Sequence, residues 1–234
     1  MAMSLSQCRI PADYAMLKIP KYPNLTELAY LHVKQSILDG SLGEGSKLTE
    51  EILATQLGIS KSPVREALNR LESEGLVSIE SRRGAHVRRF SLKDAEDLFT
   101  VRELLEVHAV GLARITPAFL DELAESIDRT RRNLDSDCLM AYIEEDIRFH
   151  NLIAAATAND ELRRIIENIN QKSILCRSKT YQISASISPD SHSRIYCALR
   201  DGNRERAQEA MRDHILLVRD SLLQSLQAET SRAV

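Results

Sequence analysis

Four side chains in the second half of the sequence have the types and spacing of ligands for a divalent metal ion. Asp146 and His150 stand four residues apart, so a helix places them on one face, one turn apart. His192 and His214 follow in two further stretches. Neutral imidazoles and a carboxylate suit zinc, nickel, manganese or iron. The alternative for each residue alone is an ordinary surface or hydrogen-bonded core residue, and both interpretations stay open at this point.

The elements that would position these four residues are helices. Residues 91–234 show no convincing alternation of apolar and polar residues, and glycine occurs there only at positions 111 and 202. Helical spacing and capping residues predict six helices, at about 91–114, 117–135, 138–157, 160–184, 190–201 and 204–228. We therefore expect an antiparallel bundle of six to seven helices, with His192 near the start of the fifth and His214 within the sixth. Bundles build metal and ligand sites in their core from facing helices.

A second group of side chains suits nucleic acid. Apolar residues recur at helical spacing from Leu48 to Leu57, Gly58 ends that run, and a second apolar stripe extends to Leu71 before Gly75. Two short helices joined by a tight glycine turn form a helix-turn-helix, whose second helix enters the major groove. The residues at the start of that helix are donors to phosphates and guanine edges, namely Ser60, Lys61, Ser62 and Arg65.

Together with the helix-turn-helix, a small β hairpin is expected to complete the DNA-binding unit, here named the reader. Residues 76–80 predict a strand and residues 87–90 its return, with a basic tip at residues 81–86 that contains Arg83 and Gly84. A capping box that begins at Asn24 predicts a first helix up to Gly40. The fold class is therefore mainly α. We expect an irregular arm over residues 1–23, a winged helix-turn-helix over 24–90 and the helical domain over 91–234.

The motif Ser-Pro-Val-Arg-Glu-Ala-Leu at residues 62–68, with Arg-Leu-Glu at 70–72 and Glu-Gly-Leu-Val at 74–77, resembles the signature of the GntR family of bacterial transcription regulators. The resemblance implies a homodimer on a palindromic operator. Lys61, Ser62 and Arg65 would then supply base and phosphate contacts, and Arg83 and Gly84 the wing contact near the minor groove. One difference from the family puts a further DNA contact in doubt. Glu51 stands about where some members carry a basic residue that touches DNA.

Residues 91–228 resemble the FCD ligand-binding domain of the FadR-like branch of this family. The resemblance is carried by Val-Arg-Glu-Leu-Leu-Glu at 101–106, by Asp146 and His150 in their spacing, and by His192 and His214. It implies that these four residues hold one divalent transition metal, such as zinc, nickel or manganese, beside a small carboxylate effector. It also makes Arg102 a candidate contact for the effector, although a salt bridge with Glu106 would explain Arg102 equally well.

Composition supports a globular protein rather than a membrane or secreted one. Of 234 residues, 43% are hydrophobic and 28% charged, and the sequence has neither a long apolar run nor a signal-like N-terminus. The four cysteines are widely spaced, which favours reduced thiols over a disulfide framework. The net charge is −3, but residues 1–90 carry two more basic than acidic residues. We therefore expect a cytoplasmic protein that contacts DNA through small basic surfaces.

The two resemblances thus imply a transcription regulator whose operator affinity changes with a small carboxylate, and we expect a repressor because repression is the commoner mode in the family. Two alternatives remain. The first is a constitutive DNA-binding dimer with a purely structural metal. The second is a metallo-enzyme, against which stands the lack of an additional base such as the Glu of an H-E-x-x-H arrangement. We expect no enzyme activity.

Overall fold

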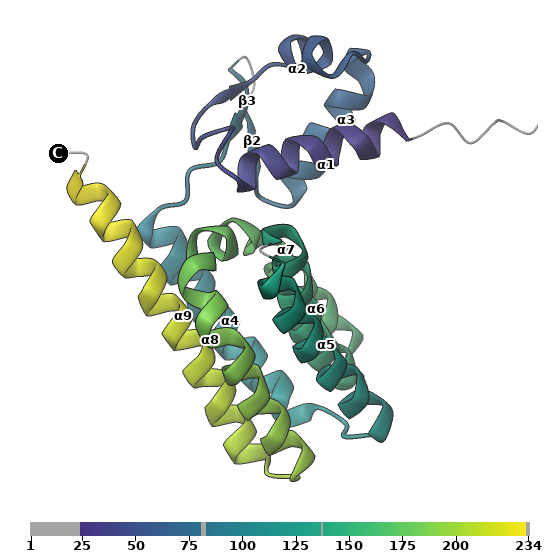
Figure 1. Cartoon of the computed structure of the whole chain (residues 1–234), viewed down its shortest axis with the longest axis vertical. Helices are drawn as coiled ribbons and strands as arrows, with labels where there is room; N and C mark the ends of the chain where they lie inside the picture. Colours follow the sequence, from purple (N-terminus) through teal and green to yellow (C-terminus); the bar gives the residue numbers. More distant parts are fainter. Residues whose placement is uncertain (1–23, 81–82, 137, 233–234) are drawn as a thin grey trace, which may run out of the picture.

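The computed structural model describes residues 24–80, 83–136 and 138–232, so the arm expected over residues 1–23 lies outside it. A small N-terminal part of three helices and a short sheet stands against one end of an all-helical part (Figure 1). In the N-terminal part the elements are α1 (Leu25–Leu38), β1 (Lys47–Leu48), α2 (Glu50–Leu57), α3 (Lys61–Ser73), β2 (Val77–Glu80) and β3 (Gly84–Val87). In the helical part they are α4 (Leu92–Leu112), α5 (Pro117–Asp135), α6 (Leu139–Ala156), α7 (Asp160–Lys172), α8 (Ile174–Arg200) and α9 (Arg204–Arg232).

The helix-turn-helix forms where its glycine turn was predicted. The side chain of Thr49 caps α2, and Gly58 ends that helix with a φ of 67°, a left-handed conformation that glycine adopts without steric cost. α3 begins after Ser60, which occupies the N-cap position without a capping hydrogen bond from its side chain. The buried stripe of α3, which includes Val64 and Leu71, packs against α1 and α2. This packing leaves the start of α3 exposed.

The wing has one strand more than predicted and a shorter tip. The strand order is β1-β3-β2, and β3 pairs antiparallel with both neighbours. The return strand predicted at residues 87–90 is wrong, because β3 already begins at Gly84, which pairs with Glu80. Gly84 has a φ of 90°, so the chain can reverse over a shorter loop than a residue with a side chain would allow. Residues 88–90 then lead directly into α4.

The predicted starts of three helices in the helical part are confirmed. Ser91 and Asp94 form a reciprocal capping box at α4, and Thr116 caps α5 in front of Pro117. Asn159 caps α7 by accepting a hydrogen bond from the backbone of Leu162. The domain boundary expected between residues 90 and 91 stays a prediction.

The predicted helix break between residues 184 and 190 is wrong. α7 ends earlier, at Lys172, and α8 continues through Pro189 to Arg200. The Ser-rich stretch around Pro189 is typical of a loop, but a buried proline inside a helix removes only one backbone hydrogen bond, and packing in a bundle can offset that loss. As a result His192 lies well inside a long helix rather than near the start of one.

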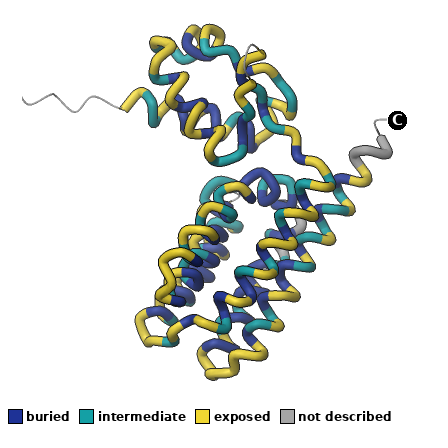
Figure 2. The backbone as a smooth tube through the Cα atoms, turned by 180° about the vertical axis from the view of Figure 1, so that it is seen from behind, coloured by how far each residue is buried: buried dark blue, intermediate teal, exposed yellow. Residues whose placement is uncertain are grey.

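The helices of the bundle turn their apolar faces inward. Figure 2 shows buried residues along the facing sides of the helices and exposed residues along their outer sides. α9 packs along α4 and α8, and α5 packs along α6. The largest fully buried side chains here include Phe99, Leu123, Phe149 and Ile153. Among the described helices, none is both long and apolar enough to span a bilayer.

Leu71→Ala should destabilise the N-terminal part strongly, because Leu71 of α3 has no exposed surface and its loss leaves a cavity. We expect about 2–5 kcal/mol less free energy of unfolding, measured by urea denaturation. The matched control is Leu28→Ala on α1, where the leucine is 53% exposed and the expected change is within about 0.5 kcal/mol. Equal losses for the two variants would contradict the orientation of α1 and α3.

Candidate functional site

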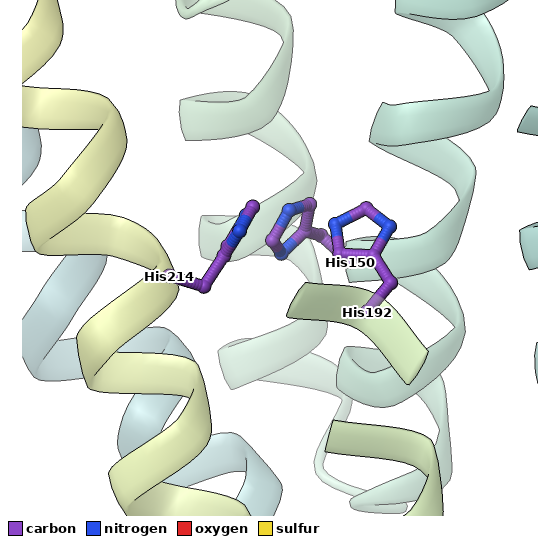
Figure 3. A group of neighbouring side chains, drawn as sticks. All are labelled: His150, His192 and His214. Atoms are coloured by element: carbon purple, nitrogen blue, oxygen red, sulfur yellow. The ribbon is translucent and has the colours of Figure 1, made fainter. Parts of the chain in front are cut away.

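Three histidines meet in the core of the helical part. His150 comes from α6, His192 from α8 and His214 from α9, and each is at least 97% buried (Figure 3). One nitrogen from each ring can be chosen so that all three lie within 4.8 Å of one another. The ring centroids are 4.8 to 5.3 Å apart. The bundle therefore brings together three of the four predicted ligands from three different helices.

Five of the six imidazole nitrogens of this cluster lack hydrogen-bond partners within the described residues. Both nitrogens of His150 and His192, and Nδ1 of His214, are buried and unpaired. Buried polar groups are normally hydrogen-bonded, and three lone pairs that converge in an apolar core are costly unless something accepts them. Phe149 stacks on the ring of His192 at a centroid distance of 3.8 Å, which fixes that ring in place. The donor set fits a divalent transition metal.

Burial also keeps the rings in the protonation state that metals require. It lowers the pKa of His192 to about 3, although the nearby Asp146 carboxylate acts in the opposite direction. Burial lowers the pKa of His214 well below its usual value as well, and the neighbouring histidines add to this effect. Both rings are therefore neutral at pH 7, which is the ligating form of histidine.

Asp146 lies beside this cluster but is shared with an arginine. Its Oδ1 is 3.6 Å from Nε2 of His192, and its Oδ2 is 4.0 Å from Nε2 of His150. Arg177 of α8 donates a hydrogen bond of 2.5 Å from Nε to the same Oδ2. Burial raises the pKa of Asp146, but the Arg177 guanidinium and the three neighbouring histidines together hold that pKa well below its usual range. The carboxylate is thus ionised, with Oδ1 facing the histidines, and its role as fourth ligand stays a prediction.

Glu106 was not predicted as part of the site, yet it connects two predicted residues. It accepts a hydrogen bond of 2.7 Å from Nε of Arg102, so the expected salt bridge on α4 is present. Its other oxygen lies 2.5 Å from Nδ1 of His150, although the two atoms are not aligned for a hydrogen bond. A carboxylate next to one nitrogen of a histidine orients the ring so that the other nitrogen can ligate a metal. The spacing of Arg102 and Glu106 indicated their pairing, but not the contact with His150.

Arg102 also lines a small cavity between the histidines and α8. The cavity has room for about 10 Å³, roughly one water, and Asp146, Arg177 and His214 line it with Arg102. Both arginines are almost fully buried, at 2% and 4% exposure. The two guanidinium charges are matched by the carboxylates of Asp146 and Glu106, and the histidine that lines the cavity, His214, is neutral. Arg102 thus lines this cavity, and its contact with an effector stays a prediction.

The predicted DNA contacts lie together on the outer face of the N-terminal part. Ser60, Lys61, Ser62 and Arg65 are all exposed at the start of α3, and Arg83 and Gly84 are exposed at the wing. Acidic neighbours pair with the three basic side chains. Glu50 accepts hydrogen bonds of 2.8 and 2.7 Å from Arg65, the Lys61 amine is 3.4 Å from Glu51, and Arg83 donates to Glu80 at 3.1 Å.

These ion pairs leave the reader available to DNA. Exposed pairs of this kind contribute about 0–1 kcal/mol each, so phosphates can replace the carboxylates at little cost. Glu51, at the position where the resemblance put a DNA contact in doubt, is engaged with Lys61. A basic groove behind the wing had not been predicted. Its basic lining residues are Lys47, Arg83, His86, Arg88 and Arg89, a suitable surface for a phosphate backbone.

Comparisons with known proteins match two stretches of the chain. Residues 25–87 match the family model of "Bacterial regulatory proteins, gntR family", and residues 97–217 match that of the FCD domain. The HTH-type transcriptional regulator LutR of Bacillus subtilis is 28% identical over 211 residues, which cover 80% of this chain and 95% of LutR. The HTH-type transcriptional repressor RspR of Escherichia coli is 24% identical over 202 residues, covering 83% and 87% of the two chains.

Solved structures give the same fold. A GntR regulator from a Rhodococcus species has a TM-score of 0.69 and 23% identity, with coverage of 85% of this chain and 97% of that one. McbR/YncC of E. coli has a TM-score of 0.68 and 24% identity, with coverage of 86% and 97%. These likenesses support the arrangement of a winged reader on a helical domain.

The double variant His150→Ala/His214→Ala should lose bound metal, because it removes two of the three converging nitrogens. We expect about one equivalent of transition metal per chain in the wild type and little in the variant, measured by elemental analysis without added metal or chelator. His32→Ala, which removes an exposed histidine on α1, is the control and should keep the metal. Circular dichroism checks that the double variant is folded. Equal metal content in all three proteins would contradict the assignment.

Arg65→Ala should weaken operator binding by roughly 5- to 150-fold, the value of one bidentate base contact. The measurement is the Kd for a labelled operator duplex at one fixed salt concentration, because affinity depends strongly on salt. Arg200→Ala is the matched control, since Arg200 is an exposed, ion-paired arginine at the far end of α8. If both variants lost affinity equally, the effect would reflect net charge and not a contact of α3.

Proposed function

We propose that this chain, which belongs to the gntR family of bacterial regulatory proteins and is a DNA-binding transcription regulator with an FCD domain, is a metabolite-responsive repressor. It acts as a homodimer, each winged reader takes half of a palindromic operator, and a small carboxylate bound at a metal site in the helical domain changes operator affinity. The name of one relative, the repressor RspR, supports the choice of repression.

One observation carries the effector part of this proposal. His214 shares a cavity wall with two buried arginines, and His150 and His192 lie beside it in the same buried cluster, in a domain that follows the exposed reader. A metal site alone would not require arginines nearby, because the positive charge of the guanidinium groups disfavours a bound cation. A carboxylate resolves this conflict, since it pairs with guanidinium groups and binds metals.

His150, His192 and His214 would hold the metal, with Asp146 as the fourth ligand. The bound metal supplies a fixed positive charge and open coordination positions for an oxygen ligand. Arg102 and Arg177 would orient the carboxylate from the side of α4 and α8. Since Glu106 engages Arg102 and Asp146 engages Arg177, each guanidinium is held in place before any effector arrives.

Direct contacts connect the effector site to the reader. On α8, Lys179 pairs at 3.1 Å with Glu44, which lies in the loop after α1. At the start of α4, Asp94 accepts a hydrogen bond of 2.9 Å from Arg88, just beyond β3. A shift of α8 or α4 would therefore move the reader and change the spacing of the two readers in a dimer. Such regulation requires that the effector bind one arrangement better than the other.

The size of the cavity favours one competing function. With room for about one water, the site as described suits a structural metal in a constitutive DNA-binding protein. A response of operator binding to small acids distinguishes the two, because a purely structural metal gives none.

Adding the correct small carboxylate should lower operator affinity of the metal-loaded protein by roughly 5- to 150-fold, the range of typical allosteric couplings. The operator is first selected from random duplexes by the protein itself, and Kd is then measured by fluorescence anisotropy against a panel of acids. His32→Ala should respond as the wild type does, and His150→Ala/His214→Ala should not respond. If no acid changes Kd, the constitutive alternative holds.

A further inference from the structure

The outward face of the three-stranded sheet carries a row of polar and basic side chains. The strand register places Lys47 of β1 and Ser78 of β2 on either side of His86 on β3. Ala85 and Val87 of β3 are buried, so the alternation along the strand turns His86 to the opposite face. Directly opposite residues on paired strands lie close together. Three residues that are far apart in the sequence therefore form one surface.

This face is hollowed into the basic groove behind the wing. The basic lining of the groove extends from Arg83 at the wing to Arg89, just beyond β3. Six residues of extended chain span roughly 20 Å. One strand of a DNA duplex presents a phosphate every 3.4 Å or so along the helix axis, at about one charge each. The groove is therefore long enough to contact several phosphates of one strand.

Two basic side chains of the groove are free of carboxylate partners. Lys47 and Arg89 are exposed, and neither forms an ion pair within the described part of the chain. Glu80 is the one acidic residue that lines the groove in that part, and Arg83 already pairs with it at 3.1 Å. The groove therefore presents positive charge that is not neutralised by the protein itself, as a surface for an anionic polymer does.

The basic side chains at the start of α3 are arranged in the opposite way. Lys61 pairs with Glu51, and Arg65 pairs with Glu50. A phosphate that approaches α3 has to displace these carboxylates, whereas a phosphate in the groove does not. Exposed ion pairs are weak, so the correct base sequence can still replace them. Contact with DNA of any sequence is therefore easier in the groove than at α3.

Gly45 provides the space in which Arg89 lies. A Cβ atom on Gly45 would be 2.6 Å from Nε of Arg89, which is too close, so only a glycine admits the guanidinium group there. The loop that contains Gly45 is fixed to β3, because its N–H donates a hydrogen bond of 2.9 Å to the carbonyl of Val87. A side chain that already lies against ordered backbone loses less conformational entropy when it binds a phosphate.

We propose that the groove is the surface on which this protein binds DNA irrespective of sequence, an inference that rests on the function proposed above. Lys47, His86 and Arg89 contact the phosphates of one strand as it passes from the wing at Arg83. The groove is continuous with the wing contact, which favours a DNA strand over a separate small anion. Phosphate contacts supply affinity and register, and the start of α3 then distinguishes the operator from other DNA.

Lys47→Gln/Arg89→Gln should weaken binding of the operator and of a scrambled duplex of equal length by the same factor, about tenfold, because it removes two phosphate contacts and no base contact. The plot of log affinity against log salt concentration should become shallower by about 2, since each phosphate contributes about 0.9 to its slope. Both Kd values are measured by fluorescence anisotropy on the full-length protein across a salt series. Arg65→Ala should instead weaken operator binding more than scrambled binding.

The matched control is Arg131→Gln/Arg200→Gln, which removes the same charge from two exposed, ion-paired arginines of the helical part. At about 150 mM salt, charges far from the DNA are screened, so the control should bind both duplexes as the wild type does. Circular dichroism checks that both double variants are folded.

Equal effects of the two double variants would overturn the inference, because net charge would then explain the loss. A larger loss on the operator than on the scrambled duplex for Lys47→Gln/Arg89→Gln would also overturn it, since the groove would then read sequence. If the wild type preferred no duplex, the proposed function itself would fail. A wild type that prefers its operator, with normal binding by Lys47→Gln/Arg89→Gln, would remove only the role of the groove.

Discussion

The helical part depends on one constraint, the burial of three imidazoles at the meeting point of α6, α8 and α9, where five of their six nitrogens have no hydrogen-bond partner among the described residues. Each unpaired nitrogen in a dry core costs free energy, roughly 1–3 kcal/mol for a typical buried polar group. Neutral histidines that converge in this way are poorly suited to a core but well suited to a cation. The packing of three helices around that point is therefore best explained by an ion that accepts all three lone pairs.

The charged side chains around the three histidines form pairs of opposite sign. Arg102 pairs with Glu106, which touches His150, and Arg177 pairs with Asp146, which faces His192. The two carboxylates stay ionised because the guanidinium groups and the neighbouring histidines together lower their pKa values by more than burial raises them. Without the arginines, burial would favour protonated carboxyl groups, and neither would orient a ring or serve a metal. The arginines thus stabilise the acidic side chains and also present a surface to an anion.

Sequence patterns predicted local structure well and tertiary contacts poorly. The glycine turn after α2 and the caps of α4, α5 and α7 depend on residues close in the chain, so their positions could be predicted. The predicted helix break near Pro189 was wrong because packing in the bundle outweighs the local preference of this stretch for a loop. Spacing alone placed Asp146 near His150, but the family resemblance was needed to group them with His192 and His214. The contact of Glu106 with His150 joins two helices and has no local signal.

The ion pairs of the reader and those in the core of the helical part differ in how easily another ligand can displace them. At the reader, Arg65 and Lys61 pair with carboxylates in the open, where each pair contributes little and DNA can displace it. In the core, Arg177 and Asp146 are both buried, and separating them would leave an unpaired charge. An anion in the cavity would therefore bind only if it stabilises the Arg177 guanidinium as strongly as Asp146 does, and only if α8 moves to admit it. Because Lys179 on the same helix pairs with Glu44 of the reader, the proposed regulation would couple entry of the anion to repositioning of the reader.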